Sequence, residues 1–361
     1  MKYLSDKKDY RTERRFRLAL AVLIALLFVI LAWQGRDLIR LPTPGTIVLY
    51  GFSIMEEVMR EGIFPAFQET WQTRTGEHVE LVAAFAGSGA ITGKIIRRFP
   101  AEVAILSSKI DVIHLMEAHV LWQSSWDHLP HEGVVVRTPF IIVVREGNPR
   151  GITDFADLMR EGVVVVQADP TTSGGGQWSI LAEYGSALRE TGNRDLAWEQ
   201  LRGIWKNVAA PQAPSAREAR RRFASGTGDA LVTYEQDAIG NPARAPVVGE
   251  LVYPPRTIIS EPTLVKIDRN VAEDQRDLVD GFVEFLWSRQ AQQIFVEYGF
   301  RSPLEELNQA NAKLGMIEDP FTLESLGGAR QAERTILKDL WRDRIKAARM
   351  TDPEHAGSAG F

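Results

Sequence analysis

Four serines in this sequence stand where a strand-like segment gives way to a helix-like one: Ser53, Ser88, Ser173 and Ser215. The first turn of a helix leaves backbone N–H groups without intrahelical acceptors and carries a partial positive charge, so anions bind there. Ser53 and Ser215 each precede a glutamate by three residues, which is the spacing of a capping box. Capping alone explains any one of these serines, but four in one chain predict a site where several helix N-termini meet an anion.

Glycines flank two of the four serines. Ser88 lies in "FAGSGAITG", and Ser173 lies in "DPTTSGGGQW" after the apolar run 162–166. Because they lack a Cβ atom, Gly89, Gly174 and Gly175 let the backbone approach a ligand closely. These two loops are therefore predicted to bind a tetrahedral oxyanion with hydroxyl and backbone N–H donors.

Motifs of reaction chemistry are missing from the sequence. "GSGAITGKI" has one residue too many between its glycines for a P-loop, and "AGSGA" has alanines where a nucleophile elbow needs glycines. The six histidines lack metal-ligand spacing, and the chain has no cysteine. We predict a binding protein and not an enzyme, without metal or cofactor. A serine hydrolase using Ser88 or Ser173 is the catalytic alternative, and no His–acid pair is evident to activate either serine.

Charge gives no support to nucleic-acid binding. The 361 residues carry a formal net charge of -5, and the basic cluster Arg220–Arg222 lies in a helical pattern that predicts a solvated face. We therefore expect no nucleic-acid partner.

Strand-like and helix-like segments alternate through the body of the chain. The strand-like runs are "TIVLYG", "HVELVAAFAG", "EVAILSS", "FIIVVREG" and "VVVVQADP". Alternation of this kind predicts an α/β fold with parallel-rich sheets, whose ligands bind at the carboxyl ends of the strands. Two long extended stretches, 138–149 and 256–268, are predicted to cross between two lobes.

The N-terminus carries an unbroken apolar run, "LALAVLIALLFVILAW" at 18–33, which follows a basic segment containing Lys7, Lys8, Arg11, Arg14, Arg15 and Arg17. Basic residues stay on the cytoplasmic side of a membrane, so the run is predicted to insert with its C-terminal end outside. The following "WQGRDLIRLP" has no A-x-A cleavage site. We therefore favour an uncleaved transmembrane anchor over a cleaved signal peptide.

From about residue 45 to 345, the chain resembles the sulfate/thiosulfate-binding proteins of ABC importers, which are type II periplasmic binding proteins. The stretches that carry the resemblance, in the family's order, are "FAGSGA", "ILSSKIDV", "FIIVVREGNP", "DPTTSGGGQW", "GTGDALVTYEQDAI", "IISEPTLVKID" and "FTLESLGGARQAE". The resemblance implies two α/β lobes that close on a dehydrated dianion, which uncharged donors at helix N-termini hold. It also implies an ABC permease in the cytoplasmic membrane as the partner.

Site residues follow from the resemblance position by position. It implies that Ser88 donates through its hydroxyl and backbone, and that Ser173, Gly174 and Gly175 form the central loop. A further backbone donor falls on Ala216, with Ser215 as the alternative. Two positions depart from the family pattern. Tyr234 stands where the family usually has a tryptophan, and the region of the family's first aspartate reads "GFSIME", so that Ser53 is the expected substitute.

The resulting division of the chain has six parts. They are a basic cytoplasmic segment 1–17, an anchor 18–34, a linker 35–45, a first lobe of 46–137 and 256–345, a second lobe 138–255, and a disordered tail 346–361. Two alternatives stay open for the function. One is a binder of molybdate, phosphate or an organosulfonate, and the other is a membrane-anchored module that senses an anion without transporting it.

Overall fold

The computed structural model describes residues 45–122, 126–240 and 249–351. The chain divides into a unit Met1–Pro44 and a unit Gly45–Phe361, and the description below concerns the second. The predicted anchor 18–34 lies outside the described residues. Within the described ranges, no helix combines the length and the apolar character needed to span a bilayer.

The first sheet has the order β2-β1-β3-β9. Its strands are β1 (Thr46–Phe52), β2 (Glu80–Ala86), β3 (Val103–Leu106) and β9 (Thr263–Lys266). β1 runs parallel to β2 and β3, and β9 is antiparallel to β3. Helices α3 (Phe64–Thr75), α10 (Arg276–Phe285) and α11 (Arg289–Glu297) share a core with its strands, and α4 (Ser88–Ile96) and α5 (Lys109–Glu117) share a second one.

Alternate residues of these strands enter different cores, because successive side chains of a strand point to opposite faces. Val103 and Ile105 pack in the core that contains Phe67 of α3 and Phe282 of α10. Ala104 and Leu106 pack in a second core, with Ile91 and Ile95 of α4 and Val112 and Leu115 of α5. The short apolar run of β3 is therefore buried on both sides, as expected for a central strand of an α/β sheet.

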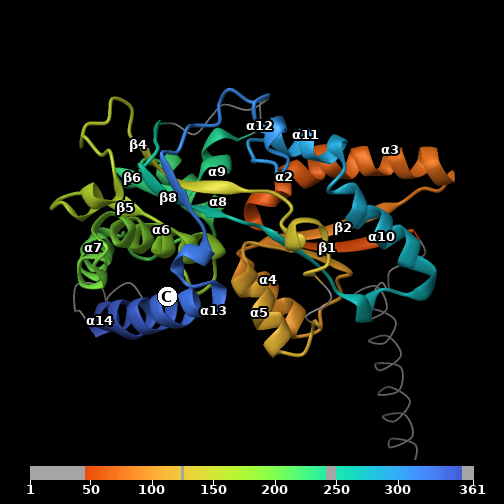
Figure 1. Ribbon diagram of the computed structural model, residues 1–361, viewed down its shortest axis with the longest axis horizontal. Helices are drawn as coiled ribbons and strands as arrows, with labels where there is room; N and C mark the ends of the chain where they lie inside the picture. Colours follow the sequence, from red (N-terminus) through yellow and green to blue (C-terminus); the bar gives the residue numbers. More distant parts are fainter. Residues whose placement is uncertain (1–44, 123–125, 241–248, 352–361) are drawn as a thin grey trace, which may run out of the picture. The chain divides into compact units, whose positions relative to one another are not determined.

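The second sheet has the order β10-β8-β4-β6-β5, and β7 also pairs with β4. Its strands are β4 (Thr138–Val144), β5 (Val165–Val166), β6 (Ala230–Tyr234), β7 (Glu250–Val252), β8 (Arg256–Ser260) and β10 (Asp319–Phe321). Its main helices are α6 (Gly174–Thr191), α7 (Arg194–Asn207), α8 (Ala216–Ala224) and α9 (Glu235–Ile239). Figure 1 shows α6, α7 and α8 gathered around this sheet.

The prediction of parallel-rich sheets is wrong for the second sheet, which is mixed. Among the described strands, the β10–β8 and β5–β6 pairs are parallel, while the central strand β4 is antiparallel to β6, β7 and β8. The reason lies in the crossovers. The chain passes from the first sheet to the second before β4 and returns after β8, so these two segments run in opposite directions and pair, with Thr138 opposite Ser260 and Val134 opposite Thr263.

The C-terminal region differs from the predicted division. Residues up to 345 are predicted to belong to the first lobe, but β10 pairs with β8 in the second sheet. The long helix η9 (Glu333–Lys346) places Trp341 edge-on against Trp205 of α7, with 5.4 Å between ring centroids. The predicted disordered tail also begins too early, because Ala347–Thr351 form helix α14, which follows η9 (Figure 1).

Glu183 is a fully buried carboxyl on α6, away from the predicted site. Its carboxylate accepts hydrogen bonds from the Gln167 amide and, at 3.1 Å, from Trp205 Nε1. Burial raises the pKa of Glu183 from 4.5 to about 8. The folded protein therefore holds a proton here that the unfolded chain releases above pH 4.5.

We expect Glu183→Gln to reduce the pH dependence of stability. The raised pKa means that the folded state binds more protons than the unfolded state between pH 4.5 and about 8. The contribution of Glu183 to the free energy of unfolding is therefore fully present below pH 4.5. It falls as the pH rises, by at most about 1.4 kcal/mol per pH unit. Chemical unfolding at pH 5, 6 and 7 should show this slope in the wild type and a smaller slope in the variant. Equal slopes would contradict the prediction.

Candidate oxyanion-binding site

The structure brings together most of the residues predicted for the site. A Cβ atom built on Gly175 would lie 3.0 Å from Ala216 Cβ, 3.2 Å from Tyr234 Cε2 and 3.3 Å from Ser173 Oγ. A Cβ atom built on Gly174 would lie 3.2 Å from Ser88 Cβ. Residues attached to both sheets therefore converge. Ser88 opens the helix that follows β2 of the first sheet, and the other residues lie on α6, α8 and β6 or next to them, in the half that contains the second sheet.

Backbone donors at the site come from three helices. Ser88 and Gly89 open α4, Gly174 and Gly175 open α6, and Ala216 opens α8. N–H groups at these first helical positions have no intrahelical acceptor, and the helix dipole adds a partial positive charge. Ser173 precedes α6 as its N-cap residue, and its side chain makes no capping hydrogen bond.

Close approach of the backbones explains the glycines in these loops. A Cβ atom on Gly89 would meet Thr171 O at 3.3 Å, and one on Gly87 would meet Pro214 O at 2.8 Å. The β2–α4 loop therefore lies directly against the loops that precede α6 and α8. A side chain at these positions would hold the two parts of the site apart.

Two capping predictions have different outcomes. Ser215 is the N-cap of α8, where its hydroxyl accepts from Glu218 N–H at 3.3 Å. Ser53 does not form the predicted capping box, because Glu56 instead accepts from Arg217 at 2.6 Å and from Arg60 at 3.3 Å. Ser53 opens η1 (Ser53–Met55), a single 3₁₀ turn that packs beside α8. Its contact with an anion stays a prediction.

The Ser88 hydroxyl differs from the predicted role. Its Oγ donates to Asp111 Oδ2 at 2.6 Å and accepts from the Ser107 N–H at 3.1 Å. A hydroxyl has one hydrogen, so this arrangement leaves Ser88 with its backbone N–H as a donor to a ligand. The prediction of a Ser88 hydroxyl donor is therefore not met in this conformation.

Sequence reasoning missed Ser107 and Asp111. Both are in "ILSSKIDV", where Ser107 follows β3 directly and Asp111 lies four residues later on α5. Ser107 Oγ donates to Asp111 Oδ2 at 3.0 Å, and Ser107 O accepts from Trp178 Nε1 of α6 at 3.0 Å. The position of Ser107 directly after a parallel strand could have indicated its place, because the carboxyl ends of such strands lie at the same edge of the sheet as the ligand loops.

Tyr234 ends β6 and is fully buried. Its ring packs on Phe140, with 4.5 Å between centroids, and on Phe52, with 5.9 Å. Within the described residues, its hydroxyl has no partner in hydrogen-bonding geometry, although the Ser107 side chain is close enough to influence it. Burial, together with the nearby Asp111 and Asp237 carboxylates, raises the pKa of Tyr234 well above 10. The phenol therefore stays neutral and keeps its hydrogen as a donor.

Two contacts between the halves of the molecule lie next to the site. The Trp178–Ser107 hydrogen bond and the Arg217–Glu56 ion pair each join the second half to the first. Ser88, Ser173 and Ala216 are all less than 5% exposed. The site is thus enclosed, and an anion held here would exchange its hydration for fixed protein donors, which strengthens each interaction.

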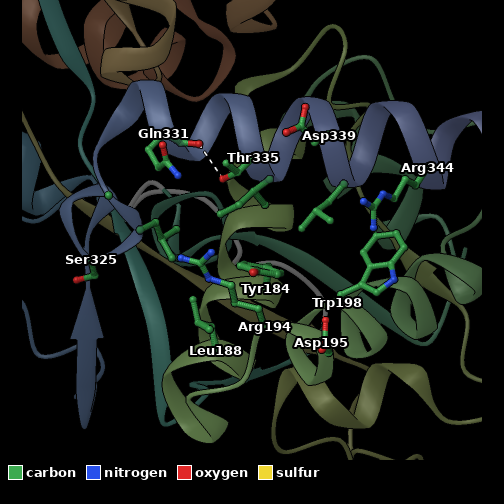
Figure 2. Close-up of a pocket in the computed structure, with 14 residues that line it drawn as sticks. Tyr184, Leu188, Arg194, Asp195, Trp198, Ser325, Gln331, Thr335, Asp339 and Arg344 are labelled. Carbon is green, nitrogen blue, oxygen red and sulfur yellow. Dashed lines mark hydrogen bonds between the residues drawn. The ribbon is translucent and has the colours of Figure 1, made fainter.

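A separate groove of about 580 Å³ lies between α6, α7 and η9. Figure 2 shows Tyr184, Arg194 and Trp198 below η9, with Arg344 close to the Trp198 ring. The Arg344 guanidinium stands 5.6 Å from the centroid of that ring. None of the residues predicted for the anion site lines this groove. Within the described ranges, no group of three or more His, Asp or Glu side chains could hold a metal ion.

Comparison with known proteins decides the family. Residues 47–301 match the family described as "Bacterial extracellular solute-binding protein". The chain belongs to this family. The chain is 30% identical to the sulfate-binding protein of Synechococcus elongatus over 345 residues, which are 93% of this chain and 97% of the relative. It is 27% identical to the thiosulfate-binding protein of Pseudomonas aeruginosa over 288 residues, covering 79% and 86% of the two chains.

Solved structures agree with this family assignment. The sulfate-binding protein SubI from Mycobacterium tuberculosis H37Rv superposes on this solute-binding protein with a TM-score of 0.72 at 26% identity, covering 80% of this chain and 98% of SubI. The periplasmic binding protein P5PA superposes with a TM-score of 0.61 at 16% identity, covering 83% and 99%, and shows the fold alone. The two-lobed α/β fold of periplasmic binding proteins is therefore confirmed.

Proposed function

We propose that this protein captures sulfate, or the similar anion thiosulfate, outside the cytoplasm and delivers it to an ABC importer. The observation that carries the proposal is the convergence of Ser88, Gly174 and Ala216 at the starts of three helices drawn from both halves of the molecule. The names of the relatives support the choice of anion. No charged donor is needed, because backbone N–H groups and helix dipoles stabilise the dianion.

The number of donors is sufficient for tight binding. Each hydrogen bond to a charged group contributes roughly 1.5–3 kcal/mol. Five or six of them, less the cost of closure and desolvation, can reach about -8 kcal/mol, which corresponds to a micromolar Kd. Donors from backbone N–H groups also favour sulfate over hydrogen phosphate, whose proton needs an acceptor.

Calorimetric titration with sulfate, thiosulfate, molybdate and phosphate tests this function. We expect micromolar binding of sulfate or thiosulfate and weaker binding of phosphate. A ligand at 1,000 times its Kd should also stabilise the protein by about 4 kcal/mol, seen as a rise in Tm. Binding of molybdate alone would assign the site to another importer, and binding of none of the four anions would overturn the proposal.

We also propose that residues 18–34 anchor the protein in the cytoplasmic membrane, with the binding unit outside. The support is the basic segment before the apolar run and the missing cleavage motif after it. Fractionation of cells should find the protein in the membrane with its first residues intact. A soluble mature protein that begins near residue 35 would contradict the anchor and leave the binding function untouched.

A further inference from the structure

Asp111 is a buried carboxyl that the proposed function does not use. It lies on α5 with 1% of its surface exposed. Three hydroxyls donate to it: Ser88 at 2.6 Å, Ser107 at 3.0 Å and Thr92 at 3.4 Å. Within the described ranges no lysine or arginine forms an ion pair with Asp111. Asp111 therefore contacts the predicted anion site directly through the hydroxyl of Ser88, which is itself a predicted site residue.

The hydroxyl hydrogens are oriented away from the site while Asp111 is ionised. Ser88 and Ser107 each have one O–H hydrogen, and both hydrogens point to the carboxylate. Ser88 Oγ also accepts from the Ser107 N–H, while the Ser107 oxygen keeps lone pairs on the side where the start of α6 approaches. A Cβ atom on Gly174 would lie 2.5 Å from Ser107 Cβ. An oxyanion beside Gly174 would therefore meet the lone pairs of the Ser107 hydroxyl, which repel it.

Charge adds to this conflict. A dianion in the enclosed site and an ionised Asp111 behind it would place three negative charges close together with little water between them. Like charges at such sites favour protonation of one partner. Burial already raises the pKa of Asp111, against the opposing effect of its hydroxyl partners and His114.

Protonation of Asp111 removes both the repulsion between the anion and the hydroxyl lone pairs and the repulsion between the anion and the carboxylate. When Asp111 takes up a proton from water, it becomes a neutral carboxylic acid and can donate its O–H to the oxygen of Ser88 or Ser107. That serine then turns its own hydrogen toward the anion. No covalent bond of the ligand changes, and the net result is one proton gained by Asp111 and one hydroxyl donor gained by the anion.

Resting on the proposed function, we propose that sulfate binding at this site takes up one proton, which Asp111 holds and Ser88 or Ser107 relays as a hydrogen bond to the anion. Capture would then be strongest in acidic surroundings and would weaken as the pH rises. A site built from backbone donors alone has no such dependence, because sulfate itself stays doubly ionised over this range.

Within the part of the chain that the structure describes, few other titratable groups lie around Asp111. His114, one turn along α5, pairs with Glu333 of η9 at 2.7 Å, and Lys338 pairs with the same Glu333 at 2.7 Å. The Glu333 hydrogen bond raises the pKa of His114. From the second half, Tyr234 faces Asp111 and stays neutral. Asp237, beyond Tyr234, is paired with Arg220 at 3.7 Å. His114 is the group whose titration needs a control.

The experiment uses the whole chain in mild detergent, titrated with sulfate from pH 5 to 8 in two buffers of different ionisation enthalpy. We expect the wild type to take up close to one proton per sulfate at neutral pH, and its affinity to fall about tenfold per pH unit above the pKa of ligand-free Asp111. Asp111→Asn should bind sulfate with little pH dependence and without proton uptake. His114→Gln should keep the proton uptake of the wild type.

Each outcome decides the proposal. Sulfate binding by the wild type without proton uptake and with a flat pH profile overturns it, while the proposed function stands. Loss of proton uptake in His114→Gln assigns the proton to His114 and also overturns it. Failure to bind any of the four oxyanions at any pH overturns the proposed function and this inference together. The wild-type titration can overturn the proposal even where Asp111→Asn does not fold.

Discussion

Gly174→Ala is expected to reduce sulfate affinity by about 10²- to 10⁴-fold. The added Cβ would lie 2.5 Å from Ser107 Cβ, and closer still to Ser107 Oγ. Rotation of the serine hydroxyl relieves the contact with Oγ but not the contact with Cβ. The start of α6 must therefore move away from β3. The N–H groups of Gly174 and Gly175 would then no longer point toward the anion. Two hydrogen bonds to a dianion are worth about 3–6 kcal/mol.

Gly93→Ala provides the control for this substitution. Gly93 lies within α4, where an added Cβ would meet only the Arg97 side chain, at 3.6 Å. Sulfate affinity in this variant should stay within about twofold of the wild type, because alanine is a better helix former than glycine and touches nothing at the site.

A compensating pair makes the steric argument sharper. In Gly174→Ala combined with Ser107→Gly, the carbon atom added on α6 is removed from the end of β3. Calorimetry should find sulfate binding partly restored relative to Gly174→Ala alone. If Gly174→Ala binds sulfate as tightly as the wild type, the α6 N-terminus is not part of the site. If the pair shows no recovery, contact with Ser107 is not the cause of the loss.

The order of strands and helices could be predicted from the sequence because buried strands appear as short apolar runs. Within the run "EVAILSS", the residues Val103 to Leu106 are all apolar, and they are buried on both faces. Strand direction could not be predicted in the same way. β4 and β8 read like other buried strands, and their antiparallel pairing depends on the chain crossing between sheets and returning. The local pattern of apolar residues does not indicate how the chain crosses between the sheets, and so it does not predict strand direction.

The site was predictable where it depends on backbone and not where it depends on side-chain hydrogen bonds. The close packing around Gly174 and Gly175 could be predicted because only glycine permits it at a helix start. The direction of the Ser88 hydroxyl could not, because Asp111 is 23 residues away in the sequence and reaches it only once α4 and α5 are packed. Glu56 is similar, since its partner Arg217 comes from the other half of the molecule.

Tyr234→Phe is expected to weaken sulfate binding by about tenfold to a hundredfold while leaving the ligand-free protein at least as stable. The hydroxyl is fully buried and has no hydrogen-bond partner within the described residues, so its removal costs the ligand-free fold nothing. The ring contacts with Phe140 and Phe52 are unchanged by the substitution. A phenol that donates to a bound dianion contributes roughly 1.5–3 kcal/mol, which gives the expected loss of affinity.

Tyr184→Phe is the matched control, because Tyr184 lies on α6 but lines the separate groove of Figure 2. Its sulfate affinity should equal that of the wild type. The loss in Tyr234→Phe should be the same at pH 6 and pH 8, because the pKa of Tyr234 is raised well above 10 and the phenol stays neutral throughout. Equal sulfate affinity in Tyr234→Phe and the wild type would show that the hydroxyl does not touch the anion. A loss that appeared only at one pH would instead tie Tyr234 to the titration of Asp111, whose carboxylate it faces.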